Sequence, residues 1–394
     1  MPSDQSTWVI SAPQDGDSEG LLQELEANLR KEIRMFDKNS LTQIPIPAFK
    51  TGTLAGLINL SEDLVKQDVF FTQTTAKIVE TIRNLLNNEQ SKVLQHTQVN
   101  DRSMDEYLKN WRWNEGRYVV HRDLRDIVET LNREMNSIDN VMKAKLNSYN
   151  LAKGTLTQIQ RKKTGNLSIK SLVEIVPAEI FIQDSEYLET LLVAVPKNSV
   201  KDWKAKYERL TNMIVPRSSQ EIASDDEFSL FSVVIFKRVH DEFAQKCREN
   251  KFILRDFKYS EDLAASQKDE LRNTEISERE LWAELLRLAR TNFSEAYQIL
   301  VHLKVVRLFA ESVLRYGLPA EYIGFFVKPD PKYTKKTLQI LINQLSYLGA
   351  RTQGSFKSSK SKSSGDEEYT GEYQALMEQE IFDFVLFEIP WITD

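Results

Sequence analysis

The stretch that decides the fold is Ser277–Pro319, SERELWAELLRLARTNFSEAYQILVHLKVVRLFAESVLRYGLP. Its apolar residues recur at steps of three and four, which keeps them on one face of a helix. Ser277 followed by Glu280 predicts a capping box at the start of this helix. Gly317 and Pro319 predict its end, because glycine adopts the left-handed conformation and proline cannot continue the helix. We therefore predict a long amphipathic helix that packs along a partner.

A second long helical pattern precedes it. Met104–Lys163 contains no proline, and from Leu124 onward its apolar residues repeat with a mean step of about 3.5 residues, half a heptad. Unbroken, roughly 60 residues would extend about 90 Å at 1.5 Å per residue. Because such a helix is too long for one compact domain, we expect it to connect two bodies. Together with a helix at Leu54–Leu86, this pattern forms the expected outgoing stalk, 54–164. A return stalk, 261–319, whose helical pattern breaks near Thr274, is expected to pair with the outgoing stalk.

Between the two arms the pattern changes to alternating and β-branched runs. We predict a compact α+β head at 165–260, with two helices near Val200–Leu210 and Lys237–Asn250. Its expected strands are Ser168–Val176, Leu188–Val195, Ser229–Phe236 and Phe252–Phe257.

The two ends of the chain also mix strands and helices. Trp8–Pro13, Tyr322–Val327 and Phe382–Ile389 are typical of strands, whereas Leu21–Met35 and Thr334–Tyr347 are typical of helices. Residues 1–53 and 320–394 are therefore expected to form one foot. The predicted fold is α+β and mostly helical: an elongated dumbbell with a long antiparallel helical stalk joining head and foot. The Ser- and Lys-rich stretch 351–372 is expected to be a mobile loop.

Composition limits the classes of protein that remain. The chain has 394 residues, 41% hydrophobic and 28% charged, and a net charge of −6. This acidic balance argues against a dedicated nucleic-acid binder. The single cysteine, Cys247, favours a reducing compartment. Without a secretory signal or an apolar run of ~18 residues, we expect a cytoplasmic protein that does not enter the bilayer by itself.

Motifs that carry chemistry are weak. His121-Arg-Asp-Leu124 copies the start of a kinase catalytic loop, but Val128 stands where the metal-binding Asn is required, and the tetrad falls inside the predicted helix. No phosphate-binding glycine loop occurs. His240 followed by two acidic residues favours a solvated polar face, and His302 favours a packed stalk histidine. We assign no catalytic, cofactor-binding or metal-binding residue.

A basic run, Arg161-Lys-Lys163, closes the predicted outgoing helix. Cations at a helix C-terminus are favoured by the helix dipole, which accounts for the run without any function. The alternative is that the run faces an acidic partner surface.

Four blocks of sequence resemble the C-subunit family of the vacuolar-type proton ATPase (V-ATPase). They are RKKTGNLSIKSL (161–172), LLVAVPKN (191–198), FILRDFKYSEDL (252–263) and HLKVVRLFAESVLRYGLP (302–319), and they occur in the family's order and spacing. The resemblance covers nearly the whole chain. Stretch 351–372 is the least family-like region, so a function cannot be assigned to it from the family.

The resemblance implies a non-catalytic stator and regulatory subunit of the pump, peripheral on the cytosolic face of vacuolar and other endomembranes. It implies that the head grips a peripheral stalk made of the E- and G-subunits. It also implies that the foot contacts a second such stalk and the cytosolic N-terminal domain of the a-subunit, and that release of this protein accompanies reversible disassembly. Actin is a further partner of some members.

Charge and amphipathicity indicate where the head would contact a partner. Basic residues gather on the exposed sides of its two predicted helices: Lys201, Lys204, Lys206, Arg209, Lys237, Arg238, Lys246 and Lys251. Two other classes remain open. An enzyme would need a deep pocket with convergent polar groups in the head. A helical scaffold or actin-binding adaptor with no role in proton transport would dimerise through the stalk, whereas we expect a monomer.

Overall fold

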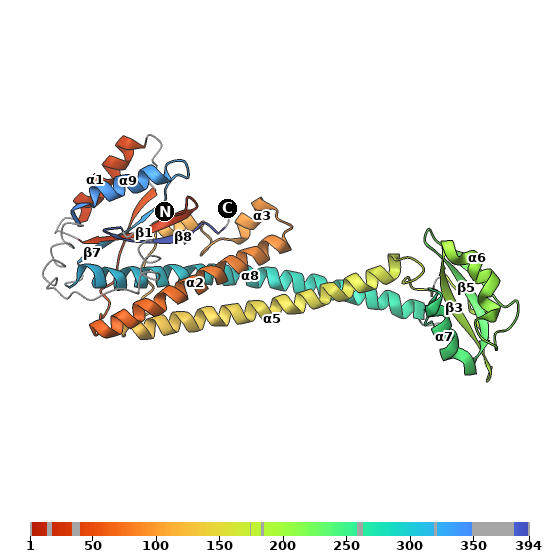
Figure 1. Cartoon of the computed structure of the whole chain (residues 1–394). Coiled ribbons are helices and arrows are strands. Elements are labelled where there is room, and N and C mark those ends of the chain that lie inside the picture. Colours follow the sequence, from red (N-terminus) through yellow and green to blue (C-terminus); the bar gives the residue numbers. More distant parts are fainter. Residues whose placement is uncertain are drawn as a thin grey trace, which may run out of the picture. The chain divides into compact units, whose positions relative to one another are not determined.

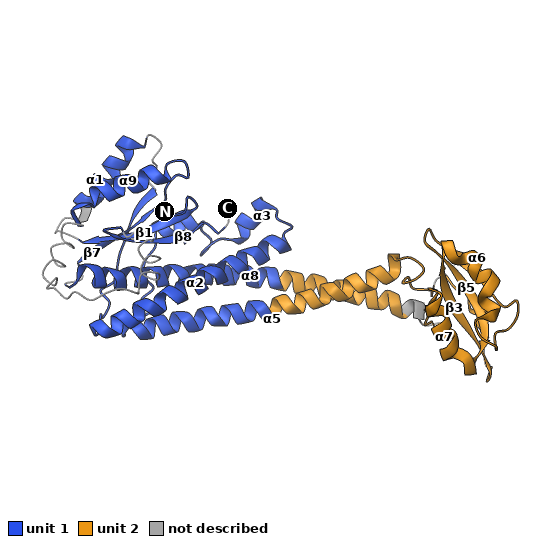
Figure 2. Cartoon of the chain, viewed as in Figure 1, with its two compact units in different colours: residues 1–144, 285–394 blue, residues 145–284 orange. Residues whose placement is uncertain are grey.

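The structure is a computed structural model that describes residues 2–13, 18–33, 40–173, 175–182, 185–257, 263–318, 321–348 and 382–392. The chain divides into two compact units, coloured separately in Figure 2: unit 1 comprises Met1–Ala144 and Leu285–Asp394, and unit 2 comprises Lys145–Glu284. Helices dominate and the sheets are small and antiparallel, which confirms the mostly helical α+β class.

Unit 1 contains a four-stranded antiparallel sheet with strand order β2-β7-β1-β8. Its strands are β1 (Ser6–Pro13), β2 (Leu41–Ile44), β7 (Tyr322–Val327) and β8 (Val385–Pro390). The central strand β1 pairs with both strands of the C-terminal segment, since Trp8 is opposite Val327 and Thr7 is opposite Ile389. The two ends of the chain thus meet in one sheet, as predicted. Strand β2 was not predicted.

Helices cover both faces of this sheet (Figure 1). Helices α1 (Ser18–Glu32) and α9 (Thr334–Gln344) pack on the face that carries Trp8, Ile10 and Phe325, all of which are fully buried. Helix α8 (Leu263–Tyr316) packs on the opposite face, where the Ser312 hydroxyl donates to the Ser11 hydroxyl at 2.8 Å. Alternate side chains of β1 therefore point to opposite faces of the sheet and pack in two different cores.

The rest of unit 1 is helical: α2 (Leu54–Leu85), α3 (Gln90–His96), α4 (Met104–Lys109) and the first part of α5 (Leu124–Thr164). The Thr53 hydroxyl caps α2 by accepting from the Gly56 amide at 3.2 Å. Leucine, isoleucine and phenylalanine side chains at helical spacing bury one side of α2.

The prediction of one helix from Met104 to Lys163 is wrong. Helix α4 ends at Lys109, and α5 does not begin until Leu124. The intervening segment folds back, so that the Trp113 indole donates to the Tyr118 carbonyl at 2.7 Å. Burial of these aromatic rings overrides the helix propensity of the segment. The first three residues of the tetrad that begins at His121 consequently precede α5, and only Leu124 belongs to the helix, as its first residue.

Helix α8 begins earlier than predicted. It starts at Leu263 and runs for 54 residues, so the capping box at Ser277 and the break near Thr274 are wrong. The Thr274 hydroxyl instead donates to the Glu270 carbonyl at 2.7 Å inside the helix. The C-terminal end is confirmed: α8 stops at Tyr316, and Gly317 has a φ of 88°. Pro319 and stretch 351–372 lie outside the described residues.

Unit 2 contains a second antiparallel sheet, with strand order β4-β5-β3-β6. Its strands are β3 (Leu188–Pro196), β4 (Gln220–Ser224), β5 (Phe228–Phe236) and β6 (Ile253–Arg255). Helices α6 (Val200–Lys206) and α7 (His240–Glu249) pack on one face through Trp203 and Phe243.

The opposite face of this sheet is covered by the described residues between 167 and 181. Leu167, Leu172 and Val176 are buried there against Leu192 and Leu230. The described residues of 168–176 form turns, so the strand predicted at Ser168–Val176 is wrong. Strand β4 was missed, because its polar sequence QEIAS has no apolar alternation.

Within unit 2, helices α5 and α8 run antiparallel. Lys145 of α5 pairs with Glu284 of α8 at 2.6 Å, and farther along α5 Ile159 lines the same cavity as Leu271 of α8. Residue numbers therefore rise on one helix as they fall on the other. The placement of the two units relative to each other, and with it the dumbbell outline and the five predicted segment boundaries, stays a prediction.

Candidate partner-binding surfaces

The eight basic residues predicted for partner binding lie around the two helices of unit 2. Lys201, Lys204 and Lys206 are on α6, and Arg209 follows in a single 3-10 turn. The remaining four lie on or beside α7: Lys237, Arg238, Lys246 and Lys251. Since α6 and α7 contribute to one core on one face of the sheet, all eight residues belong to the same side of unit 2. All are exposed except Lys246, which is half-buried.

Several of these cations already have acidic neighbours. Lys204 pairs with Glu221 at 3.4 Å, and Lys206 pairs with Asp202 at 3.6 Å. Lys246 pairs with Glu249 at 2.9 Å, and this hydrogen bond raises the pKa of Lys246. Among the described residues, the other five cations form no ion pair: Lys201, Arg209, Lys237, Arg238 and Lys251. The surface is therefore mixed in charge, with only part of its positive charge open to a partner.

Two other candidates on α7 have structural explanations. The His240 ring nitrogen Nδ1 lies 2.8 Å from Glu189 on β3, so this histidine ties α7 to the sheet. Cys247 is fully buried in the core, and burial raises the pKa of its thiol to about 12. A thiol with that pKa stays protonated and is a poor nucleophile. In the described part of the chain, no group of three His, Cys, Asp or Glu could hold a metal ion.

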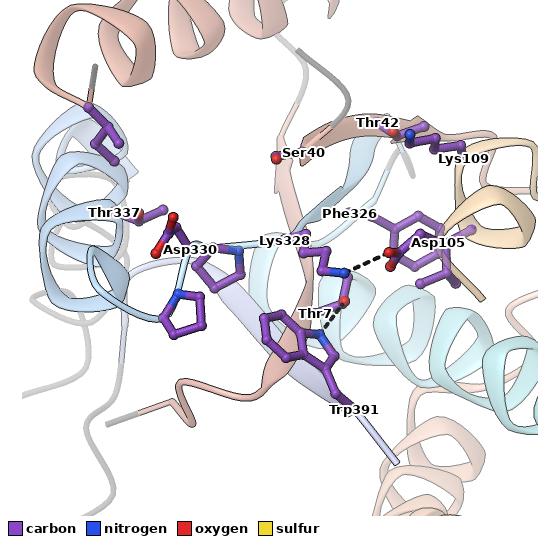
Figure 3. A pocket seen from close by; sticks show the side chains of 14 residues that line it. Thr7, Ser40, Thr42, Asp105, Lys109, Phe326, Lys328, Asp330, Thr337 and Trp391 are labelled. Carbon is purple, nitrogen blue, oxygen red and sulfur yellow. Dashed lines mark hydrogen bonds and ion pairs between the residues drawn. The ribbon is translucent and has the colours of Figure 1, made fainter. Parts of the chain in front are cut away.

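Unit 1 has a cleft of about 350 Å³ beside the sheet (Figure 3). The Lys328 ammonium lies 2.6 Å from Asp105 of α4 and 4.8 Å from the centre of the Trp391 ring. The Trp391 indole donates to the Thr7 hydroxyl at 3.0 Å. These contacts join the first strand, the residue after β7 and the C-terminal segment. These polar groups of the cleft thus bind one another, which indicates a structural junction rather than a reactive centre.

His302 of α8 is buried among aromatic rings in unit 1. Its Nδ1 donates to the Gln298 carbonyl at 2.7 Å, and its Nε2 accepts from the Asn114 amide at 3.2 Å. Burial lowers the pKa of His302 to about 4. The ring centres of Trp113 and Tyr118 lie 4.9 and 5.2 Å from it. The prediction that His302 is a packed histidine is confirmed.

None of the described helices is both long enough and apolar enough to cross a membrane. The fold and surfaces define a mostly helical α+β protein with two separately cored units, charged surfaces and mutually paired polar groups.

The chain belongs to the C-subunit family of the V-ATPase. The family model for the V-ATPase C-subunit matches residues 7–385. The chain is 36% identical over 341 residues to form 1 of the C-subunit of the V-type proton ATPase of Xenopus tropicalis, a match that covers 86% of this chain and 88% of the frog protein. It is 37% identical over 329 residues to the C-subunit of the V-type proton ATPase of Manduca sexta, covering 84% of each. Membership in this family makes the protein part of a proton-transporting V-type ATPase.

One solved structure with a lower similarity is the cytoplasmic N-terminal domain of the V-ATPase I-subunit, a homologue of the a-subunit. It aligns with 86% of this chain and with 98% of its own length. The identity is 11% and the TM-score is 0.33. A similarity this low carries no argument about shared fold or partners.

Proposed function

We propose that this chain is a non-catalytic stator and regulatory subunit of the vacuolar proton-pumping ATPase. It tethers peripheral stalks of the catalytic sector to the membrane sector and controls their reversible assembly. The observation that carries the proposal is the family match over residues 7–385, which includes both compact units and both long helices.

The architecture of each unit supports a tethering role. Each unit has its own four-stranded sheet and its own buried core, so each offers an independent body for attachment. The chain passes between the units within α5 and again within α8, both of which continue through the unit boundary. A stator resists torque, and continuous hydrogen-bonded helices resist bending better than loops do.

The proposed partners follow from this division. Unit 2 binds a peripheral-stalk heterodimer of the E- and G-subunits, here called the E–G heterodimer. Unit 1 binds a second one together with the cytosolic N-terminal domain of the a-subunit. The eight basic residues around α6 and α7 are the proposed contacts on unit 2, supported by the exposure of seven of them and by the open charge of Lys201 and Arg238. The protein acts at the cytosolic face of endomembranes and is a monomer when isolated.

Calorimetry with the full chain and a purified E–G heterodimer tests the proposal. Saturable heat, with at least one E–G heterodimer bound per chain, is the expected result. The absence of heat at concentrations well above those of the assembled pump would end the stator hypothesis. Sedimentation of the isolated chain as a stable homodimer would favour the scaffold alternative instead.

A further inference from the structure

Unit 2 holds a cavity of about 350 Å³ that neither α6 nor α7 lines. It is formed by the last turns of α5, by residues 170, 171, 173 and 175, and by residues 267, 268, 270 and 271 of α8. Half-buried apolar side chains line it, among them Ile159, Val173 and Leu271. Four lysines line it as well: Lys162, Lys163, Lys170 and Lys268. We call this cavity the lysine pocket.

The walls of the lysine pocket are held in place by hydrogen bonds. The Ser171 amide donates to the Lys162 carbonyl at 2.6 Å, and the Ser171 hydroxyl donates to the Gln267 side chain at 2.7 Å. The Arg255 guanidinium donates to the Leu167 carbonyl at 2.9 Å and to the Lys170 carbonyl at 2.7 Å. The segment between α5 and the sheet is thus attached to α5, to α8 and to β6. The pocket is preformed, which lowers the entropic cost of binding.

Helix capping explains only part of the charge. Lys162 and Lys163 lie in the last turn of α5, where cations oppose the helix dipole. Lys170 and Lys268 come from other segments, yet they line the same cavity. Among the described residues that line the pocket, Glu270 is the only acidic one, and Lys162, Lys163 and Lys170 form no ion pair with any described residue. Cations brought together from three segments around apolar side chains favour an anionic partner that also carries an apolar group.

We propose that the lysine pocket is the anchor site for an acidic amphipathic helix of the peripheral-stalk partner. One apolar side chain of that helix occupies the cavity, and carboxylates one turn away pair with Lys162, Lys163 and Lys170. This inference rests on the proposed function, and it assigns the tight contact to a surface other than α6 and α7.

A compact phosphate ligand fits the pocket less well. Phosphate sites commonly use amides at a helix N-terminus or the forked donors of arginine. Here α5 presents its C-terminal end, whose carbonyl groups carry partial negative charge. A phosphate would also leave the apolar side chains uncovered. A helix with separated carboxylates satisfies both the lysines and the apolar lining.

The dissociation rate of the full chain from a purified E–G heterodimer tests the anchor. We expect the double variant that carries Lys162→Glu and Lys163→Glu to dissociate about tenfold faster or more, because contacts at an anchor site act mainly on the off-rate. Lys162→Gln with Lys163→Gln should have a smaller effect in the same direction. Leu271→Gln changes no charge, and it should also accelerate dissociation.

Lys153→Glu with Arg279→Glu is the matched control, since both residues are exposed in unit 2 and lie outside the pocket. This control changes the net charge by the same amount as Lys162→Glu with Lys163→Glu. It should change the dissociation rate by no more than about twofold, as is common for exposed charges. Circular dichroism of each variant checks that it is folded.

Three results would overturn the anchor. In the first result, wild type binds, but the pocket variants dissociate at the wild-type rate or no faster than the control. The proposed function then stands, and the proposal that the lysine pocket is the anchor site is wrong. If ATP gives saturable heat that the Lys162/Lys163 variant abolishes while E–G dissociation is unchanged, the pocket belongs to a phosphate ligand. If wild type does not bind E–G at all, both proposals fail.

Discussion

The Asp68 carboxylate of α2 and the Lys304 ammonium of α8 form an ion pair of 2.7 Å in the interior of unit 1. Both side chains are only 6% exposed. Arg307, one turn farther along α8, pairs with the same carboxylate and stacks 4.1 Å from the centre of the Phe387 ring on β8. One carboxylate thus compensates two cations and links α2, α8 and the sheet. Burial lowers the pKa of Lys304, and the attraction of Asp68 opposes that shift.

Removing the carboxylate should destabilise unit 1 strongly. Asp68→Ala leaves two cations without their counter-charge, and breaking a buried pair in this way costs about 3–5 kcal/mol. Urea-induced unfolding measures the loss. Asp63→Ala, at an exposed position of the same helix, is the control and should change stability by less than about 0.5 kcal/mol. Equal stability of the two variants would show that water or other groups compensate Lys304 and Arg307.

The buried His302 should make stability depend on pH. Its pKa is about 4 in the folded chain, against an ordinary value of 6.5, so below pH 6.5 the unfolded chain binds a proton that the folded chain does not. The free energy of unfolding therefore falls as pH decreases from about 6.5 toward 4, by up to about 3 kcal/mol in total. Above about pH 6.5 the contribution is constant.

His302→Gln removes this titration and keeps an amide that can donate and accept. We expect wild type to lose about 2 kcal/mol more than the variant between about pH 6.5 and pH 5, where most carboxylates remain ionised. Urea unfolding at each pH gives the comparison. Parallel profiles for the two proteins would refute a role for His302 in the pH dependence.

Two glycines should respond oppositely to alanine. Gly317 ends α8 with a φ of 88°, so Gly317→Ala places a side chain in the left-handed region and should cost about 1 kcal/mol. Gly154 lies within α5, and a Cβ there would meet no atom within 4 Å. Gly154→Ala should therefore stabilise by about 0.5–1 kcal/mol through higher helix propensity. Thermal unfolding tests both, and shifts of the same sign would contradict the assignment.

Cys247 reports on the integrity of unit 2. Its thiol is fully buried and its pKa is raised to about 12, so at about pH 8 almost no thiolate is present. Ellman's reagent should modify the folded chain only as fast as α7 opens, and urea should increase the rate in step with unfolding. The fully unfolded chain should release one equivalent, because the sequence contains one cysteine. Rapid labelling without denaturant would show that α7 does not cover the thiol.

Local sequence patterns correctly predicted the helices and strands whose structure depends mainly on their own residues. Strands β3 and β5 follow from apolar runs, and the end of α8 follows from Gly317. The break before α5 was missed because it depends on His302, which is distant in sequence and binds the Asn114 amide. The lysine pocket was missed for the same reason. The basic run at the end of α5 is visible in the sequence, but only the fold brings it to the same cavity as Lys170 and Lys268.

The open cations on α6 and beside α7 should affect the rate of association with the E–G heterodimer rather than its release. Lys201 and Arg238 are exposed and lack ion pairs within the described chain, so their charge can steer an acidic partner. Lys201→Glu with Arg238→Glu should slow association severalfold, weaken its salt dependence and leave dissociation unchanged, because rim charges act mainly on the on-rate.

Lys204→Glu with Lys206→Glu is the comparison for this surface, since these lysines already pair with Glu221 and Asp202 and have less free charge to lose. Surface plasmon resonance at two ionic strengths separates the association and dissociation rates. If Lys201→Glu with Arg238→Glu accelerates dissociation as much as the Lys162/Lys163 variant, this surface carries binding contacts instead of steering the partner.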